Sequence, residues 1–403
     1  MKRPRLISLA LSILAPLVSY SPTAWAQVTL VPVGQTNNGG YASAVAVSGN
    51  YVFLANGTDG LRVYDASNST NPINVAHNND GGNAFGLVLW SNYLYLANDY
   101  DGLRIYDISH PANPVNVGHS INIFFCHAVS LALVSHYVFQ ADVACGLRVC
   151  DVSIATDPVV ICPSTPVTGG QFYGPFGVVV QGHYAYTACA LDGLRVYDVA
   201  DPANPTPVGH SVNAGVARGI AVSGNYAYLA NGSDGLRIYD VTDPTNPVNV
   251  GQAPVDSQYS DDWSVKVNGQ YAFVSNDTDG VHIYDVSDPA NPSELGSANV
   301  GFVRDAVVAG SYLYLANDTS GLRILSLGIP SPPQLSITRT DTNALVVCWA
   351  ATPASFALKQ AAALDILQWE AVTNAPTVVA GQYQTVVWPA AVRQFYRLKA
   401  APR

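Results

Sequence analysis

The chain has 403 residues and a formal net charge of −10, with 28 acidic residues against 18 lysines and arginines. This acidity argues against a nucleic-acid-binding surface, which needs clustered basic residues, and against attraction to an anionic membrane. The only glutamates are Glu294 and Glu370, so nearly all of the acidic residues are aspartates. Because the short side chain of aspartate accepts hydrogen bonds from the backbone of turns, this composition indicates a protein rich in turns.

The first 26 residues have the pattern of a secretory signal peptide. Three basic residues precede a mostly apolar stretch from Ile7 to Val18, and Ala24-Trp25-Ala26 fits a small-residue cleavage site. The apolar stretch is too short for a transmembrane anchor. We therefore expect residues 1–26 to be removed and the protein to be exported, as a secreted, periplasmic or cell-surface protein without membrane insertion.

A repeat with steps of 41 to 47 residues follows. Its most regular part reads Gly-Leu-Arg, then Val or Ile, Tyr and Asp. The glycines that anchor the seven copies are Gly60, Gly102, Gly146, Gly193, Gly235, Gly280 and Gly321. This period, with several short strands in each copy, is typical of a β-propeller blade.

The fifth copy shows the four strands expected of each blade. We expect strands at Ile220–Val222, Tyr226–Ala230, Leu236–Asp240 and Val248–Val250, separated by turns rich in Gly, Asn, Asp and Pro. The last copy lacks a fourth strand, whereas Val28–Gly34 resembles one. We therefore expect the N-terminal strand to complete the last blade, which would close the ring and remove an exposed edge.

The recurring core Gly-Leu-Arg-[Val/Ile]-Tyr-Asp-[Val/Ile]-[Ser/Thr]-Asp-Pro resembles the LVIVD repeat of secreted and surface bacterial and archaeal proteins. The resemblance covers residues 28–327. It implies an all-β fold, with a seven-bladed β-propeller at residues 27–328. It implies no common activity and no catalytic residues.

Residues that recur in most copies are expected to build the blades. The repeated arginines share one strand face with repeated tyrosines, so we expect them to lie between blades, against carboxylates or carbonyl oxygens. The alternative is a ring of anion-binding arginines. The arginines in question are Arg62, Arg104, Arg148, Arg195, Arg237 and Arg323.

A ligand site is expected where the copies differ. The segments before the first strands and the loops between the second and third strands fall at one end of the disc, around the central channel. The side chains gathered there are Asp261, Asp262, Trp263, Arg218, Arg304, Asp305, Phe85, Phe176 and His127. Aromatic faces beside charged groups suit a carbohydrate or another polar organic ligand. We therefore predict a binding or adhesion scaffold whose ligand, a carbohydrate or a protein partner, is bound at this mouth.

Alternatives to this interpretation remain open. The mouth could belong to a hydrolase or lyase that uses the carboxylates and His127 as general base and acid, although no catalytic motif is present. It could also belong to a structural spacer that binds no small ligand. No cofactor is predicted, and the alternative is calcium at Asp261 and Asp262, with Asp277 and Asp99 on nearby loops.

The cysteines concentrate in the third and fourth copies. Export permits disulfides, and we expect a bridge among Cys126, Cys145 and Cys162. The alternative is a thiolate–imidazole metal site formed by Cys126, His127, Cys145 and Cys189, although these residues lack a regular ligand spacing.

The C-terminal part begins with a proline-rich linker at residues 329–333, and the repeat pattern is absent from 334–403. Short strands are expected at 345–349, 356–360, 385–388 and 394–398. The ending Phe395-Tyr396-Arg397-Leu398 resembles the fibronectin-III-like or immunoglobulin-like tail modules of bacterial secreted proteins. The resemblance implies a small β-sandwich that serves as a spacer, adhesive or sorting element. We expect the whole chain to be a monomer.

Overall fold

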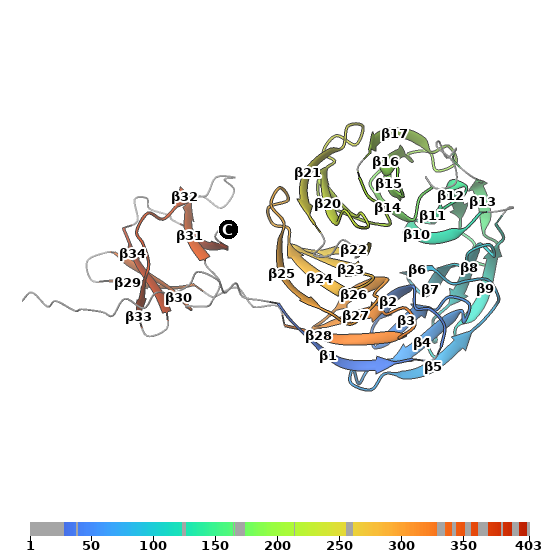
Figure 1. Cartoon of the computed structure of the whole chain (residues 1–403), viewed down its shortest axis with the longest axis horizontal. Helices are drawn as coiled ribbons and strands as arrows, with labels where there is room; N and C mark the ends of the chain where they lie inside the picture. Colours follow the sequence, from blue (N-terminus) through green and yellow to red (C-terminus); the bar gives the residue numbers. More distant parts are fainter. Residues whose placement is uncertain are drawn as a thin grey trace, which may run out of the picture. The chain divides into compact units, whose positions relative to one another are not determined.

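The structure is a computed structural model (Figure 1). It describes residues 28–37, 39–122, 126–163, 165, 174–212, 214–254, 261–328, 335–340, 344–350, 356–361, 370–379, 382–388 and 395–400. The expected signal peptide at 1–26 and linker at 329–333 lie outside the described residues. The described elements are all strands, and these residues contain no helix long and apolar enough to cross a membrane. The chain divides into one unit at Gln27–Pro330 and a second that includes Ser331–Arg403.

Seven four-stranded antiparallel sheets, here called blades 1 to 7, form the first unit. Figure 1 shows them arranged around a common centre. Blade 1 consists of β2 (Ala44–Ser48), β3 (Tyr51–Ala55), β4 (Leu61–Asp65) and β5 (Ile73–Asn78), and blade 2 of β6 (Gly86–Trp90), β7 (Tyr93–Ala97), β8 (Leu103–Asp107) and β9 (Val115–Ser120). Blade 3 consists of β10 (Ala128–Val134), β11 (Tyr137–Asp142), β12 (Gly146–Asp151) and β13 (Val159–Cys162), and blade 4 of β14 (Gly177–Gln181), β15 (Tyr184–Cys189), β16 (Gly193–Asp198) and β17 (Thr206–Ser211).

Blade 5 consists of β18 (Gly219–Ser223), β19 (Tyr226–Ala230), β20 (Leu236–Asp240) and β21 (Val248–Ala253). Blade 6 consists of β22 (Asp262–Asn268), β23 (Tyr271–Asn276), β24 (Gly280–Asp285) and β25 (Ser293–Ala298). Blade 7 contains β26 (Asp305–Ala309), β27 (Tyr312–Ala316) and β28 (Leu322–Gly328), and β1 (Thr29–Thr36) pairs with β28. The four strands expected in the fifth copy are confirmed.

The hydrophobic cores lie between neighbouring blades. Phe53 and Leu61 of blade 1, for example, belong to one fully buried cluster with Leu94 and Tyr106 of blade 2. The period-2 alternation of a strand places one set of side chains on each face of a blade, and both faces are covered. The repeated Leu and Tyr of the motif are therefore residues of the packing between blades.

A recurring glycine in the fourth strands allows the blades to approach closely. A Cβ added at Gly118 of β9 would lie 1.9 Å from the carbonyl oxygen of Ala155 in blade 3, and one added at Gly251 of β21 would lie 1.9 Å from that of Pro289 in blade 6. No side chain fits there, so the glycine belongs to the scaffold rather than to a ligand site.

The repeated arginines bind the carboxylates and carbonyl oxygens expected of them, both within a blade and between blades. Arg62 Nε donates to Asp59 Oδ2 at 2.6 Å, because the Asp-Gly hairpin loop of its own blade lies three residues before it. Arg104 Nη2 donates to the Asp80 carbonyl at 2.9 Å, in the segment between blades 1 and 2. The predicted partner types are therefore confirmed, and the predicted placement between blades holds for some of the arginines, with a contact to the same blade added.

The second unit contains two sheets. One has the order β29 (Ser336–Arg339), β30 (Leu345–Ala350), β34 (Gln382–Val387) and β33 (Thr377–Val379). The other has the order β32 (Glu370–Ala371), β31 (Phe356–Ala361) and β35 (Phe395–Ala400). The four strands expected from the sequence correspond to β30, β31, β34 and β35. A small core joins Val347, Trp349 and Val387 to Leu358.

Candidate ligand-binding site

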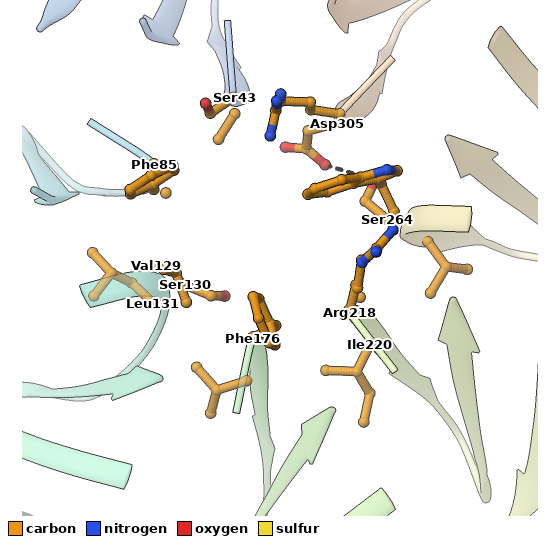
Figure 2. Close-up of a pocket in the computed structure, with 18 of the residues that line it drawn as sticks. Ser43, Phe85, Val129, Ser130, Leu131, Phe176, Arg218, Ile220, Ser264 and Asp305 are labelled. Atoms are coloured by element: carbon orange, nitrogen blue, oxygen red, sulfur yellow. Dashed lines mark hydrogen bonds between the residues drawn. The ribbon is translucent and has the colours of Figure 1, made fainter. Parts of the chain in front are cut away.

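One residue from each blade faces the centre of the first unit, at or just before the start of the innermost strand. We call this set the channel ring. It consists of Ser43, Phe85, Val129, Phe176, Arg218, Trp263 and Arg304. These residues and their neighbours line a cavity of about 330 Å³ (Figure 2). The lining is drawn from all seven blades, so the cavity exists only when the blades are assembled.

The same backbone hydrogen bond holds the channel ring in most blades. The Phe85 N–H donates to the Ala97 carbonyl at 2.9 Å, and Arg218 and Arg304 bond in the same way to Ala230 and Ala316, both at 2.9 Å. In blades 3 and 6 the ring residue lies at a register shift between the first two strands. The scaffold therefore fixes the backbone and leaves the side chain at this position free to differ.

Three consecutive blades place charged groups and one aromatic ring on one side of the cavity. The guanidinium carbon Cζ of Arg218 lies 4.2 Å from the centre of the Trp263 ring, and that of Arg304 lies 4.7 Å from it. Phe302 contacts the same indole, with ring centres 5.3 Å apart. Guanidinium groups stack favourably on an indole face, so the two arginines and the tryptophan hold one another in place.

Each of the two arginines is also anchored by one carboxylate. Arg218 Nη1 donates to Asp261 Oδ2 at 2.9 Å, and Arg304 Nε donates to Asp318 Oδ1 at 2.6 Å. A guanidinium carries five N–H donors, so most of them have no acceptor among the described residues. The Nε1–H of Trp263 also lacks such an acceptor, but it is buried and does not face the cavity. The donors that this side offers to a ligand are therefore those of the two arginines.

Asp305 is the acidic residue in the cavity lining, and its oxygens are already engaged. Oδ2 accepts the Val45 N–H at 3.3 Å, and Oδ1 accepts the Ser264 hydroxyl at 3.1 Å (Figure 2). Lys266 Nζ lies 3.5 Å from the same Oδ1. Asp305 thus links blades 6, 7 and 1, and it offers little acceptor capacity to a ligand.

The opposite side of the cavity is mostly apolar. Blades 2 to 4 contribute Phe85, Leu131 and Phe176 to the lining, together with the hydroxyl side chain of Ser130. Figure 2 shows Phe85 and Leu131 across the cavity from Ser264 and Arg218. The cavity is thus amphipathic, and a ligand that fills it meets hydrocarbon on one side and hydrogen-bond donors on the other.

The structure brings six of the nine predicted residues into this lining: Arg218, Trp263, Arg304, Asp305, Phe85 and Phe176. Asp261 is not part of the lining, and its carboxylate pairs with Arg218. Asp262 is only 3% exposed, and its Oδ1 accepts the Asn276 amide at 2.9 Å. Burial raises the pKa of Asp262 to about 7, although the Asn276 hydrogen bond opposes this shift. It lies between blades 5 and 6, where its N–H donates to the Gly232 carbonyl at 3.1 Å.

His127 also lies outside the lining. Its Nδ1 is 2.7 Å from Asp99 Oδ1, and its ring centre is 4.0 Å from that of Tyr100. The carboxylates considered for calcium are thus engaged elsewhere, Asp99 with His127 and Asp261 with Arg218. This pairing leaves the calcium alternative without support from the geometry.

The cysteines form one disulfide, Cys126–Cys145, which is one of the bridges expected from the sequence. This bond corrects the alternative of a metal site formed by Cys126, His127, Cys145 and Cys189. Two of those four ligands are a disulfide and have no thiolate to offer. The thiol of Cys189 is buried, and burial raises its pKa to about 12, which disfavours the thiolate that a metal requires.

Sequence reasoning missed Lys266, which also lines the cavity. Its ammonium side chain is about half exposed, at 50%. A signal was present, because Lys266 is the only lysine between residues 27 and 330. The equivalent positions in the other blades carry Ala or Val, for example Ala46 and Val307.

Comparisons with known proteins show a repeat family and a fold. A family profile described as LVIVD repeat matches residues 39–79, 81–120, 176–212, 214–253, 261–300 and 300–341. No curated protein matches the sequence. The crystal structure of the computationally designed Ika8 protein is similar, with TM-score 0.54, 8% identity, and coverage of 74% of this chain and 100% of that chain. A chain of the Mitotic Checkpoint Complex crystal structure is also similar, with TM-score 0.54, 14% identity, and coverage of 79% of this chain and 98% of that chain. At such identities the likeness concerns the fold alone.

Proposed function

Because the chain belongs to the LVIVD repeat family, whose repeat builds the scaffold, we propose that its function lies where the blades differ, in the channel cavity. The protein is an exported binding or adhesion scaffold that holds a small polar organic ligand there. The observation that carries this proposal is the lining itself, to which all seven blades contribute, five of them through the same backbone hydrogen bond, with side chains that vary from blade to blade. Its volume is in the range of small-molecule pockets, roughly 300–1,000 Å³.

Binding is favoured over catalysis by the state of the candidate catalytic groups. Asp305 is held by a backbone N–H and a hydroxyl, and His127 is not in the lining. A general base and a general acid must both lie within hydrogen-bond distance of the reacting atoms. The predicted pair of a carboxylate and His127 is therefore not assembled in the cavity lining.

We further propose that β1 closes the ring. Gly34 of β1 meets the carbonyl of Ser69 in blade 1, as Gly118 of β9 meets that of Ala155 in blade 3. Gln35 Oε1 accepts from Arg323 Nη2 at 2.8 Å. Ala42, just before blade 1, also forms a bridge with Asp318 of blade 7. These contacts support β1 as the fourth strand of blade 7.

A glycine substitution tests this closure. Gly34→Ala is expected to lower the free energy of unfolding by about 1–3 kcal/mol, because its Cβ would lie 2.0 Å from the Ser69 carbonyl oxygen. Gly118→Ala is the positive control, since its Cβ would meet the Ala155 carbonyl oxygen at 1.9 Å. Urea unfolding of the two variants and of the native protein measures both changes in the free energy of unfolding. A cost in Gly118→Ala without one in Gly34→Ala would show that β1 is not packed as a fourth strand.

For the second unit we propose a small β-sandwich of its two sheets that serves as a spacer or adhesive module. The shared core of Val347, Trp349 and Leu358 supports this arrangement. The resemblance to fibronectin-III-like and immunoglobulin-like tails stays a prediction.

Thermal unfolding of residues 27–403 with added glycans, small organic acids and calcium tests the binding function. A ligand at a hundred times its Kd is expected to add about 2.7 kcal/mol of stability. Trp263→Leu is expected to abolish this shift, because it removes the ring on which both arginines stack. Trp90→Leu, an exposed residue at the end of β6, is the matched control and should keep it. No shift with any compound would favour a protein partner or a spacer role instead.

A further inference from the structure

The chemistry of the cavity narrows the ligand class, on the basis of the binding function proposed above. We infer that the ligand is an organic carboxylate with a flat apolar body, held with its carboxylate toward Arg218, Lys266 and Arg304 and its body between Phe85 and Phe176.

The first argument is the balance of donors and acceptors. Arg218 and Arg304 each use one nitrogen on an aspartate, and their other nitrogens have no partner among the described residues. Both guanidinium groups line the cavity, and their side chains are 19% and 22% exposed, so a ligand can reach their remaining N–H groups. A group that only accepts hydrogen bonds suits a surface of such donors. A carboxylate has this property, because it offers two oxygens and no donor.

The second argument is the charge that a ligand can reach. Lys266 is about half exposed, whereas the Asp305 side chain is 11% exposed. The Lys266–Asp305 distance of 3.5 Å is long for a hydrogen bond, so the ammonium keeps donors for a ligand. The accessible charge in the cavity is therefore positive, although the chain as a whole is acidic. Asp261 and Asp318 orient the guanidinium groups, which favours a defined geometry for a bound anion.

The third argument is the apolar side. Phe85, Leu131 and Phe176 offer hydrocarbon and no acceptor. The hydroxyl groups of a neutral sugar can accept from the arginine N–H donors, but they carry no charge to pair with the cations, and an inorganic anion would leave the apolar side unfilled. A planar carboxylate satisfies both sides, because aromatic faces pack on its body while the cations bind its head group.

Calorimetric titration of residues 27–403 tests this inference with five probes. Benzoate combines the ring and the charge, benzamide keeps the shape without the charge, and acetate keeps the charge without the ring. Glucose and glucuronate represent a neutral and an acidic sugar. Benzoate is expected to bind at least about tenfold more tightly than benzamide, acetate and glucose, since a hydrogen bond to a charged group contributes about 1.5–3 kcal/mol.

Two lysine variants make the test specific. Lys266→Met is expected to weaken benzoate binding at least about tenfold and to weaken benzamide binding clearly less, because the neutral amide loses a hydrogen bond but no charge pairing. Lys359→Met, in β31 of the second unit, should change neither. Rising salt should weaken benzoate binding to the native protein more than to Lys266→Met.

The outcomes separate this inference from the function on which it rests. Glucose binding that is tighter than benzoate binding and insensitive to Lys266→Met would overturn the carboxylate and keep the binding function. Glucuronate binding that is tighter than benzoate binding would contradict the flat apolar body of the inferred ligand and would leave its carboxylate group standing. Absence of binding for all five probes would overturn the ligand class, and only a flat response in the wider thermal panel would overturn small-ligand binding itself.

Discussion

Replacing Asp262 with asparagine is expected to raise the free energy of unfolding by up to about 4 kcal/mol at pH 8 and to change it little at pH 4. Burial raises the pKa of this carboxyl from 3.8 to about 7 in the folded chain. Between these two values the folded protein holds a proton that the unfolded chain has lost. Stability of the native protein therefore falls as the pH rises from about 4 to about 7, and it stays low above that. Asparagine keeps the acceptor for Asn276 without the charge.

Urea unfolding of both proteins at several pH values between 4 and 8 measures this effect. Asp65→Asn is a control of opposite sign, because the Ser67 N–H bonded to Asp65 lowers the pKa of that carboxyl. The control should be the less stable protein from pH 4 to pH 8 and should approach the native protein only below pH 3.8, where the carboxyl of the folded protein takes up its proton. A difference between Asp262→Asn and the native protein that is constant from pH 4 to pH 8 would contradict the protonated state of Asp262.

Reduction of the Cys126–Cys145 disulfide is expected to lower the free energy of unfolding by about 3 kcal/mol. The two cysteines are 19 residues apart, so the bond restricts a loop of the unfolded chain that contains β10 and β11. The bond also links the start of blade 3 to the hairpin loop that carries Asp142, a fully buried carboxyl whose pKa is raised by burial.

Urea unfolding with and without dithiothreitol measures this contribution. The double variant Cys126→Ser/Cys145→Ser should unfold like the reduced protein and should not respond to the reductant. Cys348→Ser, which removes a free cysteine of the second unit, should respond as the native protein does. Equal stability of the oxidised and reduced protein, with two additional free thiols confirmed by mass, would show that blade 3 does not depend on the bond.

The repeat made the blade predictable from the sequence, because its four strands are separated by turn residues whose backbone preferences are strong. Alignment of the copies also identified the residues before the first strands, and Phe85, Arg218 and Arg304 do face one cavity. These positions could be recognised because one residue per copy breaks an otherwise regular pattern.

Side-chain direction was harder to predict than position in the repeat. Asp262 and Trp263 are neighbours on β22, but a register shift between Asp262 and Ser264 interrupts the regular alternation there. Trp263 lines the cavity, whereas Asp262 is buried in the packing between blades, where its pKa rises. Nothing in the sequence indicates this register shift. Lys266 was missed for a different reason. An isolated lysine in an apolar strand belongs to no sequence motif, so the repeat analysis did not single it out.

The arginines show a different limit. Their expected partners were carboxylates or carbonyl oxygens between blades, and the carboxylate of the arginine's own hairpin was not foreseen. The loop places Asp59 within reach of Arg62 at three residues' distance. Arg104 makes the same contact with Asp101 and also donates to the Asp80 carbonyl between blades 1 and 2. The pair within the hairpin could have been inferred from the recurrence of Asp-Gly-Leu-Arg alone.

The channel ring has a consequence for how such proteins diversify. In five blades the ring residue is held by the same backbone hydrogen bond, and its side chain enters a space shared with the other ring residues. Substitutions at ring positions outside the stacked group of Arg218, Trp263 and Arg304 can therefore accumulate one at a time with small costs in stability, because they leave the cores between blades unchanged. Duplication of a blade-sized gene segment followed by point mutation at one codon per copy would generate new ligand preferences on an unchanged scaffold.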